Sequence, residues 1–89
     1  WAHRYGLVTR LVEPGTALDA ALALATEIAG NGPLALRASK QIVRRSADWP
    51  QDEQFAHQRE WSEPVATSAD AREGARAFAE KRAPEWTGT

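Results

Sequence analysis

The chain has 89 residues, a net charge of −1 and a pI near 6.1, so it lacks the basic surplus expected of a nucleic-acid-binding domain. It has no cysteine, which excludes a disulfide framework and thiolate chemistry, and no run approaching the roughly 20 apolar residues of a membrane span. Alanine supplies 18 of its residues, which favours thin helices that need a partner surface. We expect a cytoplasmic protein, and the first residue, Trp1, indicates a processed chain or a segment.

The first fifteen residues predict little regular structure. Residues 1–5 are typical of a last helical turn ended by Gly6, and residues 7–12 are a candidate for one short strand. A turn at Glu13-Pro14-Gly15 follows. Thr16 and Asp19 then resemble a capping box that opens a helix over 17–29, which the loop 30–32 ends.

Three further helices are predicted after that loop. Pro33 fits the first turn of a helix that runs to about Ser46. A helix from Gln51 to about Ser62 comes next, with Pro64 expected to break or kink it. The fold class predicted is therefore an all-α segment of about four helices, with the strand as the one further candidate.

The last predicted helix starts at Ser68, a good N-cap, and Asp70 suits the positive end of the helix dipole. Lys81 and Arg82 suit its negative end, and Pro84 stops the helix. The apolar face is expected at Ala71, Gly74, Ala75 and Phe78, and the glycine indicates a close backbone approach. Phe78 and Lys81, three residues apart, can stack on a flat ring and neutralise a phosphate.

This region resembles the C-terminal end of the crotonase superfamily, the enoyl-CoA hydratases and isomerases. The family pattern S-x-D-x-x-E-G-x-x-A-F-x-E-K-R-x-P-x-W/F is matched at its defined positions between Ser68 and Trp86. Earlier pieces match in the same order: Gly6-Leu7-Val8, residues 12–15, residues 20–29 and the helix from Gly32-Pro33 to Lys40. The resemblance therefore covers essentially the whole chain.

The resemblance implies a division into residues 1–15, the end of the crotonase core, and residues 16–89, a C-terminal helical oligomerisation region. It also implies a trimer or a dimer of trimers, and an acyl-CoA thioester as substrate without a metal or redox cofactor. The parent activity would be hydration of a trans-2-enoyl-CoA to the 3-hydroxyacyl-CoA. In the family the oxyanion hole and the catalytic glutamates lie upstream, so no catalytic residue is assigned here and the segment alone is expected to be inactive.

Two positions are candidate site residues. By resemblance, Phe78 and Lys81 reach a coenzyme A molecule bound in a neighbouring subunit, the ring beside the adenine and the ammonium beside the phosphates. Packing in the core is the favoured alternative for Phe78, because an aromatic residue on an apolar helical stripe is usually buried. For Lys81, a surface charge at the helix end is an equal alternative.

The other polar groups have simpler interpretations. Glu73 and Glu80 are expected to form surface pairs with Arg76. The basic face of the second helix is more typical of a solvated surface than of a phosphate site; it consists of Arg37, Lys40, Arg44 and Arg45. His3 and His57 are isolated, so no metal site is predicted. The tryptophans at 49, 61 and 86 suit either packing within the chain or a subunit contact.

Three alternative functions remain open. Isomerases, hydrolases, dehalogenases and synthases of the superfamily share this C-terminus. A non-catalytic helical interaction module belongs to another class, and a native gene beginning near Trp1 would favour it. A nucleic-acid-binding helical domain is disfavoured by the charge balance.

Overall fold

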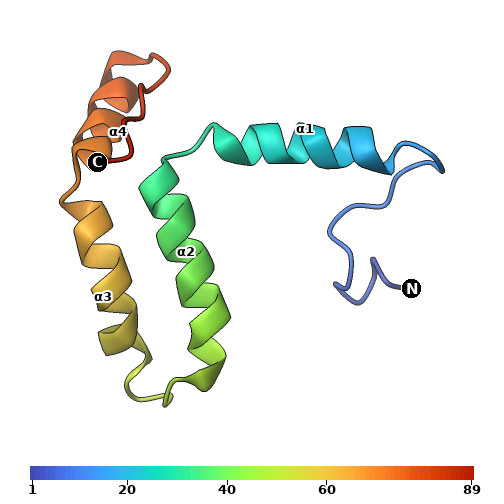
Figure 1. Cartoon of the computed structure of the whole chain (residues 1–89), viewed down its shortest axis with the longest axis horizontal. Coiled ribbons are helices and arrows are strands. Elements are labelled where there is room, and N and C mark those ends of the chain that lie inside the picture. Colours follow the sequence, from blue (N-terminus) through green and yellow to red (C-terminus); the bar gives the residue numbers. More distant parts are fainter. The chain divides into compact units, whose positions relative to one another are not determined.

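The computed structural model describes all 89 residues, which form four α-helices and one short 3₁₀ helix, with no strand. In chain order these are α1 (Ala17–Ala29), α2 (Pro33–Arg45), η1 (Ser46–Asp48), α3 (Gln54–Ala66) and α4 (Ala69–Glu80) (Figure 1). The predicted all-α fold of four helices is confirmed. No helix combines the length and the apolar character that a membrane crossing requires.

The chain forms two compact units, residues 1–30 and residues 31–89. The first begins with a single helical turn, in which the Tyr5 amide donates to the Trp1 carbonyl over 3.1 Å. Gly6 ends this turn with a φ of 76°, a conformation that glycine adopts without strain. The strand considered over residues 7–12 is wrong, because a strand needs a neighbouring strand to bond to, and the chain contains none. The division at residues 15 and 16 stays a prediction.

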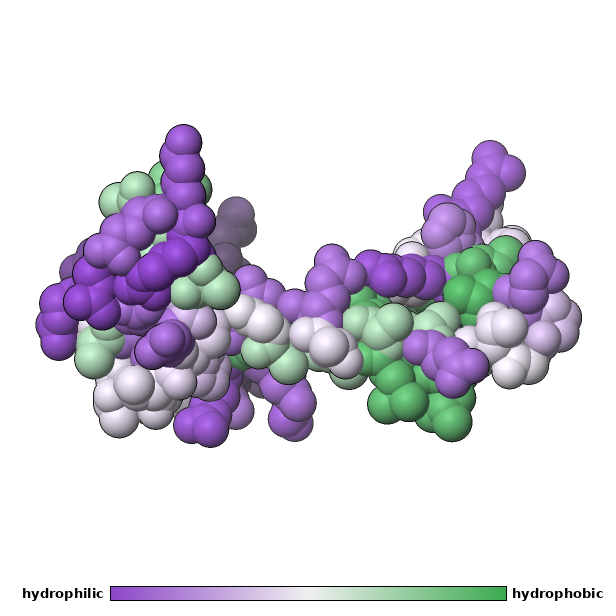
Figure 2. Space-filling model, turned by 90° about the horizontal axis from the view of Figure 1, so that it is seen from above, coloured by the Kyte–Doolittle hydropathy of each residue, from purple (hydrophilic) through white to green (hydrophobic).

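Helix α1 has the predicted bounds, but its start differs from the predicted capping box. The Thr16 hydroxyl donates to the Glu13 carbonyl over 2.8 Å, inside the preceding turn, and makes no cap bond to the helix. Arg10 joins the irregular segment to α1 through an ion pair of 3.2 Å with Glu27. Helix α1 contains no buried residue. Hydrophobic surface is correspondingly prominent in this first unit, which lies at the right of Figure 2.

The second unit contains an antiparallel pair formed by α2 and α3, which lie side by side (Figure 1). Pro33 occupies the first turn of α2, as predicted, and Ala38 is the buried residue of that helix. Two contacts of aromatic rings join the C-terminal end of α2 and the segment after it to α3. The Trp49 and His57 rings stack with centroids 5.4 Å apart, and the Arg45 guanidinium lies 5.0 Å from the centre of the Trp61 ring.

Helix α3 is where the predicted bounds are wrong. Residues 51–53 form a turn, in which the Glu53 amide donates to the Pro50 carbonyl, and the helix begins only at Gln54. It then continues through Pro64 to Ala66. A proline fits helical φ values and removes one hydrogen bond, here the one to the Glu60 carbonyl. Because Pro64 lies in the last turn, few later bonds depend on it.

Helix α4 begins as predicted, because the Ser68 hydroxyl accepts the Ala71 amide over 3.0 Å. The helix ends at Glu80, before Pro84, because Lys81 adopts a left-handed conformation with a φ of 53°. The residues after Lys81 then turn back along α4 (Figure 1).

The buried face of α4 is not the predicted one. Asp70 and Ala77 are 4% and 1% exposed, whereas Ala75 and Phe78 are exposed. The reason is the returning tail, which covers the side of the helix that carries Asp70. Gly74 does lie at a close approach, but the neighbour is the Trp86 ring and not a backbone. A Cβ added to Gly74 would lie 3.1 Å from a carbon of that ring.

Candidate functional site

The two predicted site residues lie at the C-terminal end of α4. Phe78 is 88% exposed, so the interpretation of its ring as part of the core is wrong. Lys81 is also exposed, and its amide donates to the Phe78 carbonyl over 3.3 Å, which ties the two residues together through the backbone. An aromatic ring and an ammonium are therefore both accessible at this helix end.

A cluster of charges surrounds Lys81 in the sequence. The Arg82 guanidinium bonds to both carboxylate oxygens of Glu73, over 2.6 and 3.1 Å, and its Nε donates to Glu80 over 2.5 Å. We call Glu73, Glu80 and Arg82 the carboxylate clasp. Arg76 also pairs with Glu73, as predicted, but Glu80 pairs with Arg82 and not with Arg76.

The clasp is more than a surface ion pair, because the Glu73 side chain is only 10% exposed. The hydrogen bonds from the Arg82 guanidinium, with a further one from the Glu85 amide, hold the pKa of Glu73 far below its usual range. The hydrogen bonds to Glu73 and Glu80 raise the pKa of Arg82. Both groups are therefore charged at neutral pH.

Asp70 holds the tail one turn earlier on α4. Its carboxylate accepts the Thr87 amide over 2.8 Å, the Thr87 hydroxyl over 3.0 Å and the Gly88 amide over 2.9 Å. The Thr87 amide is the main cause of the lowered pKa of Asp70. The Asp70 amide in turn donates to the Thr89 carbonyl over 3.0 Å. Asp70 thus anchors the tail, whereas the sequence assigned it only to the helix dipole.

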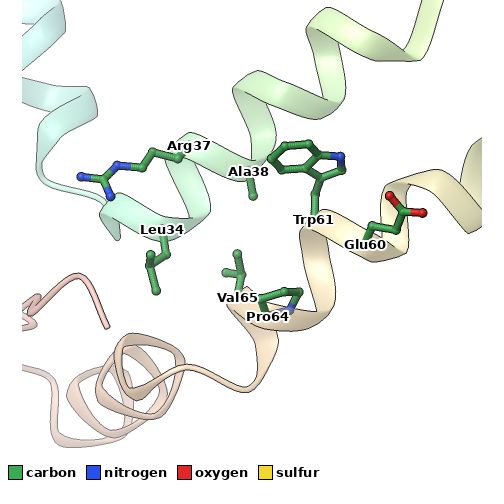
Figure 3. A pocket seen from close by; sticks show the side chains of 7 residues that line it. All are labelled: Leu34, Arg37, Ala38, Glu60, Trp61, Pro64 and Val65. Atoms are coloured by element: carbon green, nitrogen blue, oxygen red, sulfur yellow. The ribbon is translucent and has the colours of Figure 1, made fainter. Parts of the chain in front are cut away.

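An apolar groove of about 310 Å³ lies between α2 and α3. Figure 3 shows Leu34, Ala38, Trp61 and Val65 around it, with the charged ends of Arg37 and Glu60 directed away from its centre. A second hollow of about 220 Å³ lies between α2 and α4, with Trp86, Gly32 and Gly74 in its wall. No nucleophilic hydroxyl or thiol side chain lines the first. In the second, the Ser68 hydroxyl caps α4 and the Asp70 carboxylate holds the tail, so neither hollow has the composition of a catalytic centre.

A comparison with known families decides the relationship. Residues 2–89 match the family described as enoyl-CoA hydratase/isomerase. The chain belongs to this family. It is 43% identical to a carnitinyl-CoA dehydratase of Salmonella arizonae and 44% identical to an enoyl-CoA hydratase of Mycobacterium tuberculosis, alignments that cover 98% and 96% of the chain. It spans only 35% and 32% of those two relatives.

Solved structures of the family share this fold. An enoyl-CoA hydratase from Mycobacterium tuberculosis is 59% identical and superposes with a TM-score of 0.96, over 99% of this chain and 35% of that one. An enoyl-CoA hydratase from Bacillus anthracis is 32% identical with a TM-score of 0.91, over 99% of this chain and 34% of that one. The helices described here therefore correspond to about a third of a crotonase-fold enzyme.

The remaining charged groups of this family member do not form a further centre. On α2, Arg45 lies over Trp61, and Arg37, Lys40 and Arg44 are exposed. Glu53 contacts His57 over 3.3 Å and Glu63 contacts Arg59 over 3.6 Å, each within one turn of helix. No group of three or more His, Cys, Asp or Glu residues could hold a metal ion.

The three tryptophans considered as subunit contacts each have neighbours within the second unit. Trp49 stacks on His57, Trp61 lies under Arg45, and Trp86 lies close to Gly74. Each of the three is half-buried, so part of each ring is still accessible.

Sequence reasoning missed the clasp. Glu73 and Arg82 are nine residues apart and belong to a helix and to the tail behind it, so no helical spacing relates them. The available signal was the composition of this region. Pro84 and Trp86 follow the end of the helix, and two acids, Asp70 and Glu73, lie one turn apart on it and could bind a returning tail.

Proposed function

We propose that this chain is one part of an enoyl-CoA hydratase, a lyase that adds water across the 2,3 double bond of a trans-2-enoyl-CoA. The observation that carries the proposal is the family match over residues 2–89, supported by enoyl-CoA hydratases among the similar solved structures. The acyl-CoA thioester is then the substrate. No metal or redox cofactor is needed for hydration.

The chemistry of hydration supports the further proposal that this segment alone is inactive. The reaction needs backbone donors for a developing oxyanion and a carboxylic acid or base that can exchange a proton. Asp70 and Glu73 are the two acidic residues of α4 with little exposure. Their carboxylates already accept several hydrogen bonds. Their lowered pKa values make them poor bases, so they suit a structural role.

We assign Phe78 and Lys81 to a coenzyme A site of a neighbouring subunit. Their exposure at one helix end supports this assignment, since a ring that is 88% exposed has little contact with its own chain. The ring would stack on the adenine and the ammonium would neutralise phosphate charge.

Subunit contacts are the second proposed role, in a trimer or a dimer of trimers. The support is the exposed apolar surface, because soluble proteins seldom leave large contiguous apolar patches in water. The most exposed large apolar side chains of the first unit are Trp1, Tyr5, Leu7, Leu11, Leu18 and Leu22. Contact with the catalytic part of the same protein, or with a second subunit, would cover them.

The test compares this chain with the full-length protein that contains it, using crotonyl-CoA as substrate. The full-length protein should hydrate crotonyl-CoA, and this chain alone should show no turnover. Clear turnover by the chain alone would refute the proposal that it lacks catalytic groups. A full-length protein that dehydrates carnitinyl-CoA and ignores crotonyl-CoA would instead favour the activity named for the Salmonella relative.

A substitution tests the site residues in the full-length protein. Lys81→Ala should raise KM for crotonyl-CoA about tenfold, the effect of losing one charge-assisted hydrogen bond. Lys40→Ala is the matched control, because it removes the same charge from an exposed position on α2. Equal KM values for the two variants would remove Lys81 from the site.

A further inference from the structure

Lys81 occupies a conformation that is unusual for its residue type. With a φ of 53° it is the single non-glycine residue of the chain in the left-handed region. Helices commonly end on such a residue, and it is usually glycine, because a Cβ makes this conformation unfavourable. At this position the backbone conformation favours glycine, yet the chain has a lysine.

Backbone outliers of this kind persist when the surrounding structure holds them. Here the holding groups are the immediate neighbours of Lys81. Glu80 precedes it, Arg82 follows it, and the two side chains bond to each other. The Arg82 amide also donates to the Ala77 carbonyl over 3.0 Å, and the Lys81 amide donates to Phe78, so the backbone is fixed on both sides.

The clasp connects this turn to the body of α4. Arg82 reaches back nine residues to Glu73 with two hydrogen bonds, the two-point geometry in which a guanidinium fixes direction as well as distance. The Glu85 amide bonds to the same Glu73 carboxylate over 3.0 Å. The chain on the C-terminal side of Lys81 is therefore anchored to the middle of the helix.

We propose that the carboxylate clasp of Glu73, Glu80 and Arg82 positions Lys81, holding its backbone left-handed so that its ammonium meets a phosphate of a bound coenzyme A thioester. This inference rests on the proposed function. Glu73, Glu80 and Arg82 are positioning residues and do not touch the ligand. The clasp holds two carboxylates and one guanidinium, and Arg76 pairs with the same Glu73, so these charges balance. Lys81 is then the cation available to an anion at this helix end.

The physical consequence is a lower ordering cost on binding. A lysine side chain on a mobile helix end loses both backbone and side-chain freedom when it binds a phosphate. A backbone fixed beforehand loses only the side-chain part. Breaking the clasp should therefore weaken binding of the phosphate-bearing part of the ligand, while the reacting acyl part is unaffected.

The experiment measures KM and kcat of the full-length protein with crotonyl-CoA and with crotonyl-pantetheine, which carries the same thioester but no phosphate. Arg82→Ala should raise KM for crotonyl-CoA about threefold to tenfold, with kcat unchanged and KM for crotonyl-pantetheine unchanged. Glu80→Gln, at a half-exposed carboxylate, should act in the same direction if Arg82→Ala does not fold. Arg82→Lys, which can restore one of the contacts to Glu73, should recover part of the loss.

Arg76→Ala is the matched control, since Arg76 also pairs with Glu73 but does not bond to Glu80 or adjoin Lys81. It should leave both KM values unchanged. If Arg82→Ala and Glu80→Gln raise KM equally for both thioesters, the clasp acts on the general structure and the inference is overturned.

Different results would overturn the coenzyme A site and the positioning role of the clasp. If Lys81→Ala has no effect on KM for crotonyl-CoA, the proposed coenzyme A site fails. If Lys81→Ala raises this KM but Arg82→Ala and Glu80→Gln do not, the site stands and the positioning role is wrong.

Lys81→Gly provides a second test, because it should make the protein more stable and its binding of crotonyl-CoA weaker. Glycine relieves the left-handed strain, so the thermal midpoint should rise by about 2 °C. The phosphate contact is lost, so KM for crotonyl-CoA should rise about tenfold. A fall in the midpoint together with an unchanged KM would show that Lys81 is retained for stability and would overturn the inference.

Discussion

The contact between Gly74 and Trp86 allows a sharp prediction about packing. Adding a methyl group by Gly74→Ala places its carbon 3.1 and 3.4 Å from two atoms of the indole, where ordinary contacts are about 3.5–4.0 Å. The ring must therefore retreat by about 0.5 Å. It cannot do so freely, because the residues on both sides are bonded to α4: the Glu85 amide to Glu73, and the Thr87 amide to Asp70.

Two effects of opposite sign decide the magnitude. Alanine is favoured over glycine inside a helix by about 1 kcal/mol. Overpacking a restrained contact costs about 1–3 kcal/mol. We expect the packing cost to win, with a net loss of about 1 kcal/mol in the free energy of opening α4. When Trp86 is changed to alanine first, the cost disappears and Gly74→Ala should stabilise α4 by about 1 kcal/mol.

Native-state hydrogen exchange of the α4 amides measures these changes locally in the full-length protein. Gly74→Ala should reduce protection about fivefold, and in the Trp86→Ala background it should increase protection about fivefold. Gly32→Ala is the control, because a Cβ there would lie 3.7 Å or more from the same ring, an ordinary contact. Its effect should be the same with and without Trp86. Failure of the sign to reverse at Gly74 would refute the packing argument.

Two further predictions concern the tail and α3. The pKa values of Asp70 and Glu73 are lowered in the folded chain, so their contribution to stability is complete above the ordinary carboxyl values and is lost as the pH falls through the lowered ones. Protection of the tail amides should therefore fall as the pH drops below about 4. Asp70→Asn should remove this dependence at the amides of residues 87 and 88, which bond to Asp70, and leave it at residue 85, which bonds to Glu73. An unchanged profile at residues 87 and 88 would contradict the assignment. Pro64→Ala should restore a helical donor to the Glu60 carbonyl and raise the protection of the amides in the last turn of α3. Lower protection would show that the contacts of the proline ring at the groove stabilise α3 more than the restored hydrogen bond does.

The elements that the sequence predicted well are those with local signals. Helix α1 has the predicted bounds because turn and glycine residues flank an apolar periodic run. Helix α2 begins at Pro33 and α4 is capped by Ser68, since both features depend only on the next few residues. The family resemblance was recognised in the same way, from short motifs and the order in which they follow one another along the chain.

The errors have non-local causes. Helix α3 runs through Pro64 because a proline in the last turn removes only one hydrogen bond and fits helical φ values, so the local rule that proline breaks a helix fails here. The buried face of α4 is rotated away from Phe78 because the tail covers the side that carries Asp70 and Ala77, through contacts 17 and 18 residues apart. The exposure of Phe78 could not be derived from its apolar neighbours, since periodicity shows which residues share a face but not what covers that face.

The way α4 holds the tail determines which changes that segment can accept during evolution. Asp70 and Glu73 bind the amides of residues 85, 87 and 88, groups that nearly every amino acid supplies. Side-chain contacts to α4 come from Arg82, Trp86 and Thr87. The exposed side chain of Glu85 is therefore free to vary without loosening the attachment. Proline is the exception at these positions, because it has no amide hydrogen to offer.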